Sequence, residues 1–336
     1  MRSSPPPMSY PRVTAVHPVS AIEGGRIVVD GAGFPTDGPS LPGVRIGEAR
    51  ARVVYASPTR IAALVPPGLE GGPTVVRIDG VPGEDTLVNI AAPLATGLHQ
   101  VDNPVFDRDG NLYVTFSGTR GQQVPVSIFR VRPGGTRETF SSGIVNPTSM
   151  AIGPDGRLYV SSRFEGTVYR VADDGSVEPF ATDLGVCCGL AFDDDGLLFV
   201  GDRSGTVFRV DQKGQATIFA SLPSSVAAFH VAMGPDEALY VTAPTLTTYD
   251  SVYRIDRDGT VTTRYTGFGR PQGIAFDGRG SLLVVEALAG ASGLYRLPAA
   301  GDPELVLSGP GLVGVAVGPR GALVVCSNDT AYRLNL

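Results

Sequence analysis

A chain of 336 residues exceeds what one compact core usually organises, so we expect two domains. Hydrophobic residues make up 42 % of it and charged residues 18 %, and its 44 Gly and 28 Pro are spread along the chain, which is typical of many short strands and turns. The formal net charge of −6 gives no basic face for a phosphate backbone, so nucleic acid is not an expected partner.

The N-terminal segment Met1–Pro11 has no apolar run of the kind that signal peptides carry, and no stretch of 18 uninterrupted apolar residues occurs in the chain. We therefore expect no membrane partner and a cytoplasmic location, or an extracytoplasmic one if a signal peptide has been removed. The three cysteines cannot all pair with one another, which fits a reducing compartment.

Residues 9–92 alternate apolar and polar positions between turns rich in Gly and Pro. This pattern predicts short strands over Arg26–Val29, Val44–Ile46, Arg60–Val65 and Thr74–Ile78. Four motifs follow one another in the same segment: Glu23–Gly25, Gly31–Phe34, Val44–Gly47 and Leu64–Pro66. Their order and spacing resemble the IPT/TIG family of immunoglobulin-like domains. The resemblance implies a β-sandwich whose last strand falls near residues 87–91.

From residue 98 onward one short motif recurs, an aromatic residue followed by Arg and a branched aliphatic residue. Its six copies are Phe129–Val131, Tyr169–Val171, Phe208–Val210, Tyr253–Ile255, Tyr295–Leu297 and Tyr332–Leu334. Because side chains alternate between the faces of a strand, the aromatic and the aliphatic residue can pack on one side while the Arg points to the other. We therefore expect the repeated Arg to be structural.

A tight turn precedes each copy of the motif, and its last residue advances along the chain by 46, 40, 41, 43 and 41 positions. This period is that of a four-stranded propeller blade. The sequence therefore predicts an all-β fold: a six-bladed β-propeller over residues 93–336, preceded by an immunoglobulin-like β-sandwich over residues 9–92. Asp-rich turns such as Asp193–Gly196 carry the residues that hairpins favour, and we expect them to be structural and not calcium sites.

The last repeat ends after its third strand, which leaves a sheet edge that must be covered. Residues 93–98 resemble the end of the second repeat, residues 179–184, in sequence and in position before an inner strand. We expect residues around 87–96 to close the ring, so that one segment serves both domains in succession.

The strings Asp155–Val160, Gly189–Asp193 and Gly273–Asp277 resemble the NHL-repeat and gluconolactonase-like (senescence marker protein-like) propellers. In a propeller the inner strands start and the second strands end on one face, around the mouth of the central channel, where ligands bind. The residues predicted there as ligand-binding are Asn103, Arg120, Asn146, Arg163, Cys187, Cys188, Arg203, Arg270, Gln272 and Asn328.

The gluconolactonase-like resemblance also implies a divalent cation, such as calcium, held at the mouth by oxygen ligands. Asp102 falls where that family has its first carboxylate, and Asp202 and Glu286 are the other candidate metal ligands. The positions where the resemblance implies an Asn and an Asp hold residues that supply no side-chain oxygen: Cys187 or Cys188, and Ala228 or Phe229. The ligand set of the family is therefore incomplete.

Three further features of the mouth each allow two interpretations. His230 is the candidate catalytic residue, a general base if a carboxylate orients it and otherwise a lone buried histidine. The adjacent Cys187 and Cys188 form a redox-sensitive or soft-metal site or, as we expect, are two small buried side chains. Arg120, in the insert Ser117–Val126, forms with Arg163 and Arg203 either a basic rim for a carboxylate or sugar acid or a set of salt bridges.

We predict a non-catalytic or weakly catalytic recognition module that binds a small polar molecule or a peptide at the propeller mouth, while the sandwich positions the ligand or contacts a protein partner. The sequence makes no cofactor certain, and a divalent cation such as calcium is the one it allows. The alternative is a metal-dependent lactone or ester hydrolase of the gluconolactonase-like kind, with a divalent cation as its cofactor. A third interpretation is an assembly scaffold without a ligand in the channel.

Overall fold

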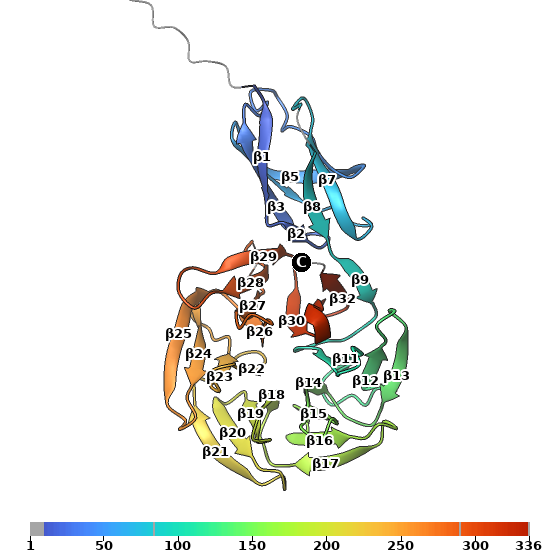
Figure 1. Cartoon of the computed structure of the whole chain (residues 1–336), viewed down its shortest axis with the longest axis vertical. Coiled ribbons are helices and arrows are strands. Elements are labelled where there is room, and N and C mark those ends of the chain that lie inside the picture. Colours follow the sequence, from blue (N-terminus) through green and yellow to red (C-terminus); the bar gives the residue numbers. More distant parts are fainter. Residues whose placement is uncertain (1–9, 83–84, 289, 335–336) are drawn as a thin grey trace, which may run out of the picture. The chain divides into compact units, whose positions relative to one another are not determined.

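The computed structural model describes residues 10–82, 85–288 and 290–334. Its elements are β-strands apart from one short 3-10 turn, η1 (Pro319–Gly321), so the predicted all-β fold class is confirmed. Among the described residues no helix has the length and apolar character needed to cross a bilayer. The chain divides into two compact units (Figure 1): one holds the residues up to Ala92 and Leu305–Pro310, and the other holds residues 93–304 and 311–334.

The first unit is built from strands of the N-terminal segment and one strand from far along the chain. Its strands are β1 (Arg12–His17), β2 (Ser20–Ala21), β3 (Arg26–Ala32), β4 (Val44–Ile46), β5 (Ala49–Ser57), β6 (Arg60–Leu64), β7 (Gly72–Ile78), β8 (Thr86–Ile90) and β29 (Glu304–Ser308). The predicted strands of this segment correspond to β3, β4, β6, β7 and β8. Strand β5 belongs to two layers, because residues 49–51 pair with β4 whereas residues 52–57 pair with β6.

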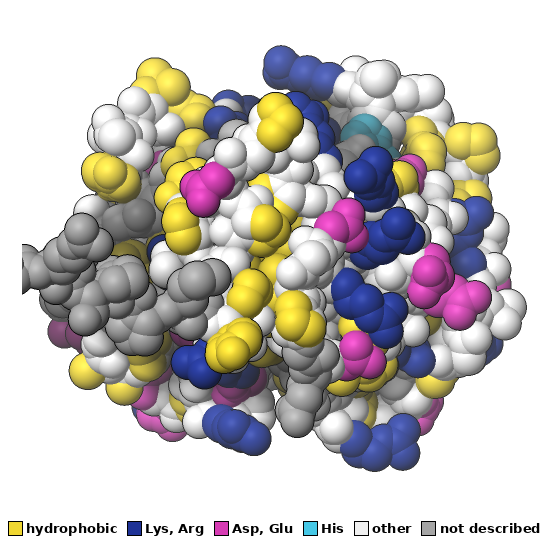
Figure 2. All heavy atoms as spheres, turned by 90° about the horizontal axis from the view of Figure 1, so that it is seen from above, with side chains coloured by type: hydrophobic (Ala, Val, Ile, Leu, Met, Phe, Trp, Pro, Cys, Tyr) yellow, Lys and Arg dark blue, Asp and Glu magenta, His cyan; other side chains and the backbone are white. Residues whose placement is uncertain are grey.

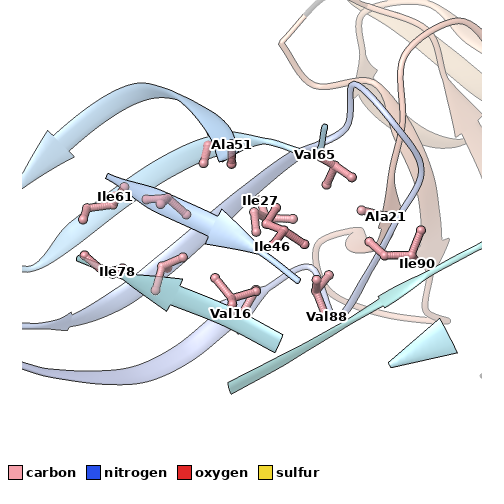
Figure 3. Packing of buried hydrophobic residues seen from close by; sticks show 14 of the residues in the cluster. Val16, Ala21, Ile27, Ile46, Ala51, Ile61, Val65, Ile78, Val88 and Ile90 are labelled. Atoms are coloured by element: carbon pink, nitrogen blue, oxygen red, sulfur yellow. The ribbon is translucent and has the colours of Figure 1, made fainter. Parts of the chain in front are cut away.

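The core of the first unit lies between its strands (Figure 3). In β3 the fully buried Ile27 and Val29 alternate with more exposed neighbours, and Ile46, Ile61 and Val88 meet them from other strands. Because every second side chain of a strand points to the same face, each strand buries one row of apolar side chains. The result is the sandwich that the alternating sequence predicts.

In the second unit the described residues form five separate four-stranded sheets, each running from an inner to an outer strand. The sheets are β10 (Val105–Phe106), β11 (Leu112–Thr115), β12 (Ile128–Val131) and β13 (Arg137–Ser141); β14 (Pro147–Ile152), β15 (Leu158–Ser162), β16 (Thr167–Val171) and β17 (Val177–Ala181); β18 (Cys187–Phe192), β19 (Leu198–Asp202), β20 (Thr206–Val210) and β21 (Ala216–Ser221); β22 (His230–Met233), β23 (Leu239–Thr242), β24 (Asp250–Ile255) and β25 (Val261–Phe268); and β30 (Leu312–Val317), β31 (Leu323–Ser327), β32 (Ala331–Leu334) and β9 (Ala92–Ala95).

The remaining repeat does not form a sheet of its own, so the expected count of six separate blades is wrong. Its strands β26 (Pro271–Phe276), β27 (Leu282–Glu286) and β28 (Gly293–Leu297) belong to a twelve-stranded sheet. The physical reason lies in β29, whose Leu307 and Ser308 pair in parallel with the two residues of β2 inside the first unit. Backbone hydrogen bonding therefore continues past the end of this repeat.

Neighbouring inner strands contact one another in the closed order β10, β14, β18, β22, β26, β30 and back to β10. The sheets therefore stand around a ring, which is the arrangement of a β-propeller (Figure 1). Strand β9 closes the ring, as expected for residues around 87–96, because it is the fourth strand of the sheet that begins with β30. Strand β8 ends at Ile90 and β9 begins at Ala92, so consecutive segments serve the two units.

The repeated arginine makes contacts within the protein in every copy of the motif, which confirms its structural role. Four of the six copies pair with a carboxylate, whereas Arg209 lies over the Phe219 ring and Arg333 donates to Pro133 O. The guanidinium of Arg130 lies 2.6 Å from Glu138 Oε1 on the next strand, and Arg170 makes the same 2.6 Å contact with Glu178. Figure 2 shows basic side chains in dark blue mixed with acidic ones in magenta and apolar ones in yellow. The face drawn there therefore carries side chains of both charges among apolar ones.

Candidate functional site

The central polar contact of the propeller joins Asp102, which precedes β10, to His230, the first residue of β22. These two inner strands stand opposite each other in the ring, three places apart, so the contact spans the channel. His230 Nδ1 hydrogen-bonds Asp102 Oδ1, and the two side chains are 0 % and 1 % exposed. The same carboxylate oxygen accepts a 2.6 Å hydrogen bond from the Asn103 backbone N–H. The carboxylate that the sequence required for orienting His230 is thus Asp102.

Each member of this pair keeps one polar atom without a hydrogen-bond partner. Among the described residues, Asp102 Oδ2 and His230 Nε2 are buried and make no hydrogen bond. A buried polar atom without a hydrogen bond destabilises the fold by about 1–3 kcal/mol. A contribution to stability therefore does not explain these two atoms, and they indicate a place where a ligand could bind. The free Nε2 is the atom with which an oriented imidazole would exchange a proton with a bound molecule.

A network that the sequence analysis did not identify holds Asp102 in place. The side chain of Gln100 donates to the Asp102 backbone O at 2.7 Å and accepts from the Thr115 N–H at 2.8 Å. Asn103 reaches two other inner strands, donating to Ile274 O at 2.7 Å and accepting from Val315 N–H at 2.9 Å. These amide side chains lock the start of the first inner strand to its neighbours, so Asn103 supports the mouth while remaining half-buried.

Arg120, Arg163 and Arg203, here called the arginine cluster, lie close enough to one another that the charges of Arg120 and Arg203 act on Arg163. Burial lowers the pKa of Arg163, and the positive charges of Arg203 and Arg120 lower it further, although the neighbouring Cys188 acts in the opposite direction. Arg163 Nη2 lies 3.4 Å from Ser117 Oγ and Arg203 Nη2 lies 3.3 Å from Val226 O. Among the described residues none of the three forms a salt bridge, in contrast to Arg130, Arg170 and Arg254 on the third strands of their sheets. Three like charges thus converge without an acidic partner.

Asn146 holds the insert that carries Arg120. Its backbone has a φ of 47°, and its buried side chain donates to Ser117 O at 2.6 Å and to Thr119 O at 2.8 Å. Its Oδ1 accepts from the Gly121 N–H at 2.6 Å. The Asn146 side chain therefore fixes the insert on both sides of Arg120 and is fully engaged in doing so.

Two of the three carboxylates predicted as metal ligands, those of Asp202 and Glu286, accept hydrogen bonds from the chain itself. Asp202 accepts from the Val186 N–H at 2.8 Å and from the Ser204 hydroxyl. Glu286 accepts from the N–H groups of Gly269 at 2.7 Å and Arg270 at 2.9 Å. Among the described residues no group of three His, Cys, Asp or Glu side chains is arranged to hold a metal ion. The residues present therefore do not fit the divalent cation that the gluconolactonase-like resemblance implies.

The adjacent cysteines are buried free thiols. Burial raises the pKa of both Cys187 and Cys188 to about 12, so both stay protonated near neutral pH and neither has the thiolate that redox exchange or soft-metal binding requires. Cys187 Sγ donates to Ser162 O at 3.2 Å and Cys188 Sγ to Val186 O at 3.3 Å. Their surroundings are those of small packed side chains.

The remaining predicted residues stand around the same face. Gln272 is buried, with its Nε2 3.2 Å from Pro271 O, whereas Arg270 and Asn328 are exposed. His99, between β9 and β10, is half-buried, and burial together with the charge of Arg163 lowers its pKa.

Comparison with known proteins agrees with this fold. Residues 11–90 match the IPT/TIG domain, and no match was found among curated proteins. The chain is similar to an auxiliary nutrient binding protein from Bacteroides ovatus, with 13 % identity, a TM-score of 0.55 and 98 % of each chain covered. It is also similar to a candidate gluconolactonase, with 16 % identity, a TM-score of 0.59 and coverage of 72 % of this chain and 90 % of that one.

A third similar structure is virginiamycin B lyase from Staphylococcus aureus, solved as a catalytically inactive variant with quinupristin. The identity is 17 %, the TM-score is 0.53, and 88 % of this chain and 95 % of that one are covered. At such identities these likenesses show the fold alone. The chain is thus an all-β protein with an immunoglobulin-like IPT/TIG unit and a β-propeller arrangement, whereas its kinship to NHL repeats stays a prediction.

Proposed function

We propose that the protein is a recognition module whose propeller mouth binds a small polar molecule or a peptide through a carboxylate. The observation that carries this proposal is the arginine cluster, which has no acidic partner among the described residues and whose Arg163 is half-buried. A guanidinium taken out of water beside two like charges is stabilised by a bound anion, and Arg binds carboxylates in bidentate geometry.

Arg163→Ala should weaken the binding of a carboxylate such as citrate or galacturonate by roughly 10- to 100-fold, because a hydrogen bond to a charged group contributes about 1.5–3 kcal/mol. Isothermal titration calorimetry at low ionic strength measures this. The matched control is Arg108→Ala, an exposed arginine in the turn after β10, at the other end of that strand from Asp102. Equal affinity of wild type and Arg163→Ala for every carboxylate tried would contradict the proposal.

A hydrolase is the second candidate, favoured by the contact of His230 with Asp102. A carboxylate on Nδ1 fixes the tautomer of a histidine and leaves Nε2 to act as a base. The similarity to a candidate gluconolactonase supports a lactone as the substrate class. Since the described residues offer no set of metal ligands, any such chemistry proposed here uses His230 and the arginine cluster alone.

Two measurements separate the two candidates, a hydrolysis assay and metal-binding calorimetry. We expect no hydrolysis of glucono-1,5-lactone above the buffer rate, and no calorimetric binding of calcium, magnesium, manganese or zinc that depends on Asp102, tested with Asp102→Ala. Turnover that falls by about 10²- to 10⁴-fold in His230→Gln, while circular dichroism shows an intact fold, would instead establish the hydrolase.

A further inference from the structure

The exposed apolar side chains of the second unit gather on the face that carries the arginine cluster. Among its described residues the exposed large apolar side chains are Phe164, Val186, Ile218, Val226, Leu246, Tyr249 and Leu288. All except Ile218, which lies on outer strand β21, stand in loops that precede an inner strand or follow a second strand. We call Phe164, Val186, Val226, Leu246 and Tyr249 the apolar rim. Contiguous exposed apolar surface bordered by charge marks an interaction site more often than chance exposure.

The apolar rim and the arginine cluster are interleaved. Arg203 donates its backbone N–H to Val186 O at 3.2 Å and its Nη2 to Val226 O at 3.3 Å. The Phe164 ring follows Arg163 in the chain and lies against Gly121 of the insert, where a Cβ would come within 3.1 Å of it. Apolar and cationic groups therefore form one mixed surface that runs over successive repeats.

The rim continues into the fourth repeat through a loop that is held rigid. Val226 donates its N–H to Pro244 O at 2.9 Å, which ties the start of β22 to the loop between β23 and β24. In that loop Asp250 Oδ1 accepts from Thr245 N at 2.9 Å and from the Thr247 hydroxyl at 3.1 Å. Leu246 and Tyr249 nevertheless remain 90 % and 62 % exposed. A fixed loop that presents a leucine and a tyrosine to solvent loses little entropy when a partner covers them.

A small acid would satisfy the arginines but leave most of the apolar rim in water. Covering loops of three repeats requires an extended ligand with apolar groups on both sides of its negative charge. Arg and Tyr are among the side chains that are enriched at the positions contributing most of the binding energy between proteins. The combination of unpaired arginines with exposed apolar side chains is complementary to an acidic residue flanked by apolar ones.

We propose that this face binds a peptide segment of another protein, with an Asp or Glu at the arginine cluster and neighbouring apolar side chains on the apolar rim. This inference rests on the proposed function, since it uses the same arginines. It adds the class of the ligand, a peptide and not a free sugar acid, and it assigns Leu246 and Tyr249 to the contact.

The test is selection from a displayed library of random heptapeptides on the immobilised full chain, followed by affinity measurements with a synthetic copy of the most enriched peptide. We expect enrichment of Asp or Glu between apolar residues. Leu246→Ser combined with Tyr249→Ser should weaken the peptide by at least tenfold and change citrate binding by less than twofold. Ile218→Ser, at an apolar position on outer strand β21 whose exposed fraction of 72 % lies between those of Leu246 and Tyr249, should leave both affinities within twofold.

The outcomes separate this inference from the proposed function. If no acidic-apolar peptide is enriched, or if the Leu246 and Tyr249 double variant binds the peptide as the wild type does, while citrate binding still depends on Arg163, the peptide assignment is overturned and the carboxylate site stands. If citrate binding does not depend on Arg163 either, both fail. A peptide that binds equally well to Arg163→Ala overturns the acidic contact and with it the inference.

Discussion

His230→Ala is expected to lower the free energy of unfolding by about 3–5 kcal/mol, because it leaves the Asp102 carboxylate buried with the Asn103 N–H as the one partner still bonded to its Oδ1. Removing one member of a buried pair lowers the free energy of unfolding by more than the net amount that the pair contributes to it, because the remaining charged group stays out of water without its partner. Guanidinium denaturation of the full chain, followed by circular dichroism, measures the change.

The matched control is His99→Ala. His99 is half-buried on the same face, and its ring contacts Phe116 edge-on, so we expect a loss of about 1 kcal/mol or less. Removing both partners, Asp102→Ala with His230→Ala, should cost less than the sum of the two single changes, because no uncompensated charge remains. If His230→Ala costs less than about 1 kcal/mol, or if the double variant is additive, the contact does not stabilise the fold in this way.

The repeat in the sequence was enough to predict the ring, because one aromatic–Arg–aliphatic motif at a period near 41 residues has few other solutions. The count of separate blades was not predictable from it. Nothing in Glu304–Ser308 indicates that its last residues also pair with Ser20 and Ala21, almost 290 positions earlier. Strand β5 was missed for a related reason: its Arg-rich alternation is half-exposed, and it divides its hydrogen bonds between two neighbours.

The sequence was enough to predict which residues lie at the propeller mouth, but not which of them contact one another. Asp102 and His230 were both placed at the mouth, but their pairing depends on which inner strands face each other across the ring. Asp202 and Glu286 looked available as metal ligands because a sequence does not show that loop N–H groups occupy their oxygens. The apolar rim could not be predicted from the sequence for a similar reason, because the exposure of Leu246 depends on the conformation of the loop that Asp250 holds.

Phe229→Ala is the second change with a large expected effect, a loss of about 3–5 kcal/mol in the free energy of unfolding. Phe229 is fully buried, directly precedes His230, and occupies space that two glycines of the third repeat leave open. A Cβ on Gly201 would lie 2.4 Å from Phe229 Cδ1, and one on Gly189 would lie 2.4 Å from Phe229 O. Removing the ring leaves a cavity next to the channel, so His230 loses part of its support.

The matched control is Phe164→Ala, the same change at a ring that is 53 % exposed, which should lower the free energy of unfolding by less than about 0.5 kcal/mol.

The glycine opposite the ring allows the packing itself to be tested. The backbone of Gly201 is not in the left-handed region, so Gly201→Ala alone should cost about 1–3 kcal/mol through the overlap of its methyl group with Phe229. In a Phe229→Ala background the added methyl group meets empty space and fills part of the cavity. The two changes together should therefore cost clearly less than their sum, as groups in contact do in a double-mutant cycle. Additive costs would mean that Gly201 is needed for some reason other than the Phe229 ring.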